Sequence, residues 1–68
     1  MNYSEFVKKE RLKNKWSQEE LANRATVSKM TLVNFELGGN IRMDKLDEIM
    51  CALGYELFPV EVPEWKVL

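Results

Sequence analysis

The strongest constraint on this chain is that helix-stop signals interrupt it at intervals of roughly a dozen residues. Gly38 and Gly39 end one helical pattern, Gly54 ends another, and a capping box at residues 17–20 starts a new helix soon after the first. Short helices in a chain of 68 residues leave only a thin core. Such a chain needs tight helical packing, a staple or a partner subunit. The sequence therefore predicts one small all-α domain.

Four helices can be delimited from caps and apolar spacing. They are expected over residues 4–14, over residues 18–24, from a Ser28 cap to Gly38, and over residues 43–53. Ser4 is the expected N-cap of the first helix, and Leu12 is among its apolar residues. The second helix has the most specific start, because Ser17-Gln18-Glu19-Glu20 is an S-x-x-E capping box.

Beyond Gly54 the apolar spacing changes from helical toward alternating. Residues 55–62 are rich in aromatic and β-branched side chains, and Pro59 interrupts them, so we predict a short or edge strand. We therefore divide the chain into a domain of residues 1–54 and a C-terminal segment of residues 55–68. An exposed apolar strand invites pairing, so a partner is expected to cover this segment.

The composition argues against several classes of function. The chain has one cysteine and no histidine, so it cannot form an internal disulfide and offers no credible zinc site. The usual pairs of nucleophile and general base are also missing, and we expect no enzyme and no cofactor. No apolar run reaches the roughly 18 residues of a membrane span, and the first residues do not resemble a secretory signal, so a cytoplasmic location is expected. Cys51 is expected to be a small, partly buried residue of the fourth helix.

The net charge of −1 conceals an uneven distribution. Residues 1–42 hold eight basic and five acidic side chains, a net charge of +3, whereas residues 43–68 hold two basic and six acidic side chains, a net charge of −4. A small binder with one phosphate-facing side would have this asymmetry, but so would ordinary solvated surface charge. Charge alone therefore leaves nucleic-acid binding open.

Three blocks of residues resemble a known family. They are Arg11-Leu12-Lys13-Asn14-Lys15-Trp16-Ser17-Gln18-Glu19-Glu20-Leu21-Ala22, Val27-Ser28-x-x-Thr31-Leu32-x-x-x-Glu36-x-Gly38 and Leu46-x-x-Ile49-x-x-Ala52-Leu53-Gly54. Over residues 6–54 their spacing resembles the lambda-repressor-like, Cro/XRE-type helix-turn-helix domain. The short join Ala25-Thr26-Val27 independently requires a steep crossing of the second and third helices. The resemblance implies a compact all-α domain of four to five helices with a short C-terminal β-strand.

The resemblance also implies a structural ion pair between Arg11 and Glu36, which would tie the first helix to the third. The alternative is two unrelated surface charges. Two positions depart from the family pattern. Thr26 stands where glycine is usual, which predicts either a differently bent turn or about 1 kcal/mol of strain. Ile41-Arg42 replaces the frequent Pro-Ser ahead of the fourth helix, which puts the fine geometry there in doubt.

By the same resemblance the third helix enters the major groove of double-stranded DNA and reads bases. Lys29 can donate to guanine, Asn34 can bind adenine bidentately, and Met30 can pack on a thymine methyl unless it is a core residue. The residues expected to hold phosphates through side chains and helix N-termini are Ser17, Gln18, Ser28, Thr31, Asn40 and Arg42.

Family members commonly act as dimers on pseudo-palindromic sites. The expected dimer contact consists of Met50, Leu53, Leu57, Phe58, Val60 and Val62. The sequence therefore favours a homodimeric, sequence-specific DNA-binding repressor that is associated with the nucleoid. The C-terminal segment is also similar to Hip-type antitoxins, so an antitoxin that binds a toxin protein and represses its own operon is the first alternative. A helix-turn-helix fold used only for protein contact is the second.

Overall fold

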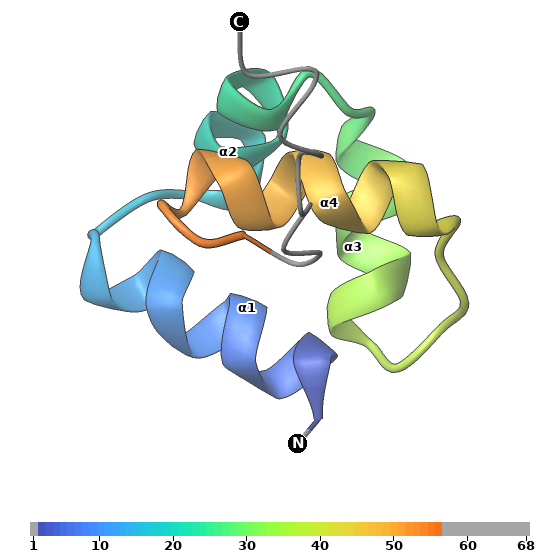
Figure 1. Ribbon diagram of the computed structural model, residues 1–68. Coiled ribbons are helices and arrows are strands. Elements are labelled where there is room, and N and C mark those ends of the chain that lie inside the picture. Colours follow the sequence, from blue (N-terminus) through green and yellow to red (C-terminus); the bar gives the residue numbers. More distant parts are fainter. Residues whose placement is uncertain (1, 57–68) are drawn as a thin grey trace, which may run out of the picture.

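The computed structural model describes residues 2–56, which form four helices and no strand. The helices are α1 (Tyr3–Lys13), α2 (Gln18–Ala25), α3 (Lys29–Glu36) and α4 (Met43–Ala52). α2 packs against both α3 and α4, and α1 packs against α3. In Figure 1, α4 crosses the middle of the domain, with its first residues on the side of α3 and its last residues on the opposite side. The prediction of a compact all-α, four-helix domain is confirmed.

The expected C-terminal strand falls mostly outside the described residues. Residues 57–62, which include Pro59, are not described, and Tyr55 and Glu56 do not form a strand. None of the helices within residues 2–56 combines the length and the apolar content that crossing a bilayer would require.

Side-chain caps explain where the first three helices begin. Asn2 Oδ1 accepts the backbone N–H of Ser4 at 3.0 Å and caps α1, so the expectation that Ser4 is the N-cap was wrong. Both residue types are good caps, and the one nearer the N-terminus extends the helix. Ser17 Oγ accepts the N–H of Glu20 at 3.0 Å, and Ser28 Oγ accepts the N–H of Thr31 at 3.1 Å. α4 begins after Arg42 without a side-chain cap.

All four helices end in the same hydrogen-bonded turn. Each turn contains one left-handed residue, which is the C-cap itself in α2 and the residue after the C-cap in the other three helices; these residues are Lys15, Thr26, Gly38 and Gly54, with φ of 61°, 58°, 97° and 92°. The next N–H then donates to the carbonyl five residues back, as in the Schellman motif: Trp16 to Arg11, Val27 to Ala22, Gly39 to Asn34 and Tyr55 to Met50, at 2.8–3.1 Å. Thr26 therefore takes the strained conformation rather than a differently bent turn.

The core lies where the four helices meet. Its buried side chains are Val7, Leu21, Ala22, Ala25, Leu32, Phe35, Leu46, Ile49 and Met50. Trp16 packs at its edge, with the Arg24 guanidinium 4.4 Å above the ring. Leu12 was expected to belong to the apolar side of the first helix, and this expectation was wrong, because its side chain is 55% exposed. The buried side of α1 carries Val7 and Arg11, and Leu12 points about 100° away from Arg11.

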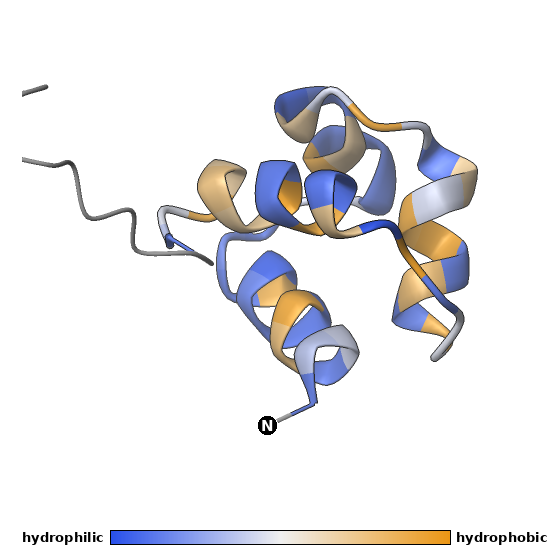
Figure 2. Cartoon of the chain, turned by 45° about the vertical axis from the view of Figure 1, so that its right-hand side comes forward, coloured by the Kyte–Doolittle hydropathy of each residue, from blue (hydrophilic) through white to orange (hydrophobic). Residues whose placement is uncertain are grey.

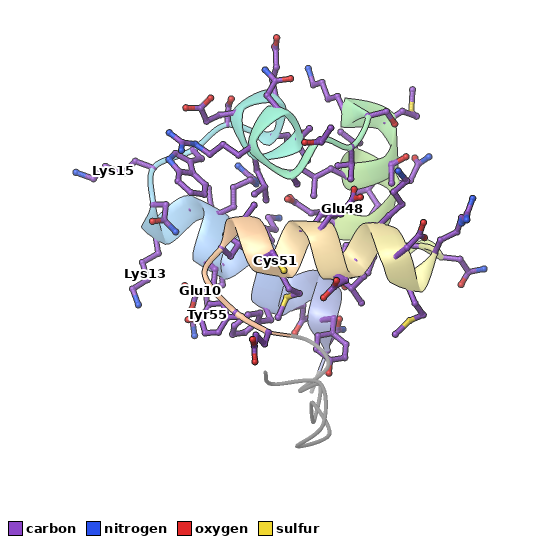
Figure 3. The ribbon with its side chains drawn as sticks, turned by 45° about the horizontal axis from the view of Figure 1, so that its top comes forward. Glu10, Lys13, Lys15, Glu48, Cys51 and Tyr55 are labelled. Carbon is purple, nitrogen blue, oxygen red and sulfur yellow. The ribbon has the colours of Figure 1, made fainter. Side chains whose placement is uncertain are left out.

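Cys51 lies on the exposed side of α4, so the expectation of partial burial was also wrong (Figure 3). Its Sγ lies 3.9 Å from Asp47 Oδ1. Partial desolvation and the negative charges of Asp47, Glu56 and Glu48 raise the pKa of the Cys51 thiol. A raised pKa keeps the thiol protonated and makes it a weak nucleophile at neutral pH.

Candidate nucleic-acid interface

α2 and α3 pack against each other across a turn of residues 26–28. Their contact includes a small side chain, because Ala22 is only 1% exposed and belongs to the same core cluster as the fully buried Leu21 and Leu32. A larger residue in place of Ala22 would overpack this site and push the helices apart. The turn and the packing together hold α3 with one side in the core and the other side toward solvent.

The outward side of α3 carries all three residues expected to read bases. Lys29 and Asn34 are exposed, and Met30 is 66% exposed, so Met30 is not a core residue. Helical spacing places two further residues on this side, the half-buried Val33 and the 81% exposed Leu37, which is the C-cap of α3. The sequence reading missed Val33 and Leu37 as surface residues, although both follow Lys29 at four-residue steps.

The hydroxyls expected to hold phosphates lie at the N-termini of α2 and α3. Ser17 and Ser28 are exposed N-caps, and Thr31 is half-buried one turn into α3. The hydroxyls of Ser28 and Thr31 are 2.8 Å apart. The unpaired N–H groups in the first turn of a helix and its dipole favour an anion nearby, so both helix ends can accept a phosphate.

A buried ion pair lies beneath this surface. Arg11 and Glu36 form two parallel bonds, Nε to Oε2 at 2.8 Å and Nη2 to Oε1 at 2.9 Å, with side chains only 10% and 3% exposed. The remaining Arg11 Nη1 donates to the carbonyl of Trp16 at 2.9 Å. The structure thus brings Arg11 and Glu36 together, and the pair ties α1 to the last turn of α3.

Gln18 links this ion pair to the surface. Its Nε2 donates to Glu36 Oε1 at 3.3 Å, and the residue is half-buried. The bond uses one of the two amide N–H donors and leaves the other donor and the carbonyl oxygen for an outside group. The orientation of Gln18 therefore depends on a carboxylate that is itself held by Arg11.

Asn40 and Arg42 lie exposed in the segment between α3 and α4. The Arg42 side chain is 81% exposed, and its Nε lies 3.3 Å from Asp44 Oδ1. An ion pair this exposed contributes at most about 1 kcal/mol, so a phosphate could replace the carboxylate at little cost.

Charge distinguishes the outward side of α3 from the other described helices. The only carboxylate of α3 is Glu36, which is turned inward, whereas α1, α2 and α4 carry exposed carboxylates that include Glu5, Glu19 and Glu48. No group of three potential metal ligands occurs within residues 2–56. The surface of α3 is therefore the part of the described chain that is most compatible with a polyanion.

The residues expected to form a dimer contact are only partly described. Met50 is 5% exposed and packs in the core of its own chain, which leaves it little surface for a second copy, and Leu53 is half-buried. Leu57, Phe58, Val60 and Val62 lie outside the described residues.

Tyr55 fixes the point from which the C-terminal segment leaves the domain. Its ring packs edge-on against Phe6, with centroids 5.2 Å apart, and its hydroxyl donates to Glu10 Oε1 at 3.2 Å. Figure 3 shows Tyr55 beside Glu10, and Lys13 and Lys15 extending away from the domain. The chain after α4 is thus anchored on α1.

Comparison with protein families gives one match. The family model described as Helix-turn-helix (HTH_3) matches residues 7–59, a span that contains α2, α3, α4 and most of α1. Neither the curated proteins nor the solved structures gave a match.

Proposed function

Because this chain belongs to the Cro/XRE-type helix-turn-helix family, a DNA-binding and non-enzymatic family, we propose that it is a sequence-specific transcriptional repressor. In this proposal it binds a pseudo-palindromic operator as a homodimer and acts in the cytoplasm at the nucleoid. The observation that carries the proposal is the outward side of α3, which is exposed and free of carboxylates, and which is flanked by two capped helix N-termini.

The base contacts are assigned to Lys29, Met30 and Asn34. Lys29 donates to guanine O6 or N7, Asn34 reads adenine through its amide, and Met30 packs on a thymine methyl. All three are exposed on the same side of one helix, as a reader of the major groove requires.

The phosphate contacts are assigned to the hydroxyls of Ser17, Ser28 and Thr31, to Gln18, and to Asn40 and Arg42. Ser17 and Gln18 lie at the start of α2, Ser28 and Thr31 at the start of α3, and Asn40 and Arg42 between α3 and α4. They orient the domain on the duplex and carry no base information themselves.

The second copy is proposed to pair through residues 55–68. This assignment is supported by the apolar sequence of that segment and by the anchoring of Tyr55 on α1. The end of α4 lies on the side of the domain away from α3 (Figure 1), so a contact there would leave the DNA-reading side free.

An antitoxin role is the second candidate. The same apolar segment that could pair with its own copy could instead bind a toxin protein. Co-purification of a toxin with the tagged chain, expressed from its native operon, would favour this role. Recovery of the chain alone would favour the simple repressor.

Equilibrium binding to duplex DNA tests the proposed function. The full chain should prefer its selected site over a scrambled duplex by about 10³-fold or more, and its affinity should fall as salt increases. Equal affinity for both duplexes, or no binding at low salt, would instead support a fold used only for protein contact.

A further inference from the structure

The centre of the outward side of α3 is apolar. At about 100° per residue, Val33, Leu37 and Met30 occupy the middle of the exposed arc, with Lys29 and Asn34 at its two edges. Met30 and Leu37 are 66% and 81% exposed, so neither is covered by residues 2–56. Figure 2, where α3 is on the right, shows hydrophobic positions between hydrophilic ones along this helix.

An exposed apolar strip on a small domain normally marks a contact surface. The edges of this strip indicate the partner. Lys29 and Asn34 carry the groups that bind guanine and adenine in the major groove, and no carboxylate lies on this side of α3. An apolar protein partner would gain nothing from these two edges, whereas a polyanion that presents apolar groups would use both.

Building on the proposed function, we propose that α3 reads a thymine-rich half-site, with Val33 and Leu37 acting together with Met30 as receptors for thymine methyl groups. The thymine methyl is the one apolar group that a base presents in the major groove. Lys29 and Asn34 would then select the guanine or adenine at the borders of this thymine-rich segment.

The helix geometry predicts the distance, in base pairs, between the contacted thymine methyl groups. Met30 and Leu37 are seven residues apart, which corresponds to about 10 Å along a helix axis. A base-pair step rises about 3.4 Å, so the methyls nearest to these two side chains should be about three base pairs apart. Val33 should contact a position between them.

The test removes one methyl group at a time. A duplex that the wild-type chain selects from a random pool is resynthesised with single thymines replaced by uracil, which lacks only the methyl. Each methyl buried against Met30, Val33 or Leu37 should contribute about fourfold in affinity. We expect two or three sensitive positions in each half-site and no effect of uracil elsewhere.

A substitution in the protein identifies which side chain contacts a given thymine methyl. Leu37→Gln removes an exposed apolar side chain and should abolish the uracil effect at one position while leaving the others unchanged. Leu12→Gln is the matched control, because Leu12 is also exposed but lies on α1, and it should change neither the affinity nor the uracil profile. A merely structural role of Leu37 would lower the affinity for the thymine and uracil duplexes equally.

The outcomes separate this inference from the proposed function. Specific binding in which no thymine-to-uracil change matters would overturn the methyl-reading role and leave the repressor proposal standing. Failure to bind any duplex would overturn both.

Discussion

At the scale of single residues, Glu36 connects the interior of the domain to the surface proposed to face DNA. Both of its carboxylate oxygens accept hydrogen bonds from the Arg11 guanidinium, and Oε1 also accepts a hydrogen bond from the side-chain amide of Gln18. A carboxylate this deeply buried is stable only while it is paired, because desolvating an unpaired charge costs several kcal/mol. The pair therefore contributes chiefly by placing α1, α3 and Gln18 in one arrangement.

The coupling between Arg11 and Glu36 can be measured directly. Glu36→Gln should lower the free energy of unfolding by about 2–4 kcal/mol, because it leaves Arg11 buried without its counter-charge. A double-mutant cycle with Arg11→Met, followed by urea denaturation, should give a coupling energy above about 1 kcal/mol. Glu20→Gln is the control, since its pair with Arg24 is about half exposed and should be worth less than about 1 kcal/mol. No coupling in the Arg11–Glu36 cycle would contradict the structural role.

Base and phosphate contacts predict different binding profiles. Lys29→Ala should weaken binding to the selected site by about 1–3 kcal/mol and relax the preference at one position of the half-site. Gln18→Ala should weaken binding to all sequences by similar factors, because a phosphate contact carries no base information. Competition binding against a panel of single-base variants measures both. A changed base preference in Gln18→Ala, together with an unchanged one in Lys29→Ala, would show that the contacts are misassigned.

At the scale of elements, the four helices end in the same type of turn, but only two of them have glycine at the left-handed position of that turn. Gly38 and Gly54 adopt the left-handed conformation at no steric cost, whereas Lys15 and Thr26 do so with a Cβ present. Thr26 has the higher cost because its side chain is β-branched. The fold retains these two turns because packing on both sides determines them.

Replacing Thr26 by glycine should therefore stabilise the domain. We expect Thr26→Gly to raise the free energy of unfolding by about 0.5 kcal/mol, which is about 1 kcal/mol of relieved strain less the added entropy of the unfolded chain. Lys9→Gly, at an exposed position inside α1, should instead destabilise the domain by a similar amount. Thermal unfolding of both variants gives the comparison. A loss of stability in Thr26→Gly would mean that its hydroxyl or methyl contributes more than the backbone strain costs.

The sequence predicted elements best where one residue had a single plausible role. The start of α2 followed from Ser17, because no other Ser, Thr, Asn or Asp lies within two residues of it, and Ser28 caps α3 as expected. The start of α1 did not, because Asn2 and Ser4 are both good caps. The exposure of Leu12 and Leu37 could not be predicted for a related reason, since an apolar residue at helical spacing does not reveal whether another element covers it.

At the scale of the whole molecule, the domain separates a DNA-facing side from the point where its C-terminal segment emerges. α3 is on one side in Figure 1 and the end of α4 is on the other. The uneven charge does not follow this division, because the net +3 of residues 1–42 lies in residues 1–15, whereas residues 16–42 hold three basic and three acidic side chains. A dimer formed near the end of α4 would leave the outward side of α3 in each copy free for DNA.

Truncation tests the proposed dimer contact. A chain of residues 1–56 keeps every described contact, including the bond from Tyr55 to Glu10, and lacks Leu57, Phe58, Val60 and Val62. We expect it to sediment as a folded monomer at concentrations where the full chain is dimeric, with its helicity checked by circular dichroism. A truncated chain that remains dimeric would place the interface elsewhere on the domain.

The central claim is that α3 reads DNA bases as part of a two-fold symmetric complex. Selection from a random duplex pool, carried out in parallel with the full wild-type chain and Asn34→Ala, tests it most directly. We expect the wild type to enrich two inverted half-sites and Asn34→Ala to relax one position, an adenine, at the same place in both. Enrichment of no sequence, of a single unrepeated site, or of identical sites by the two chains would contradict it.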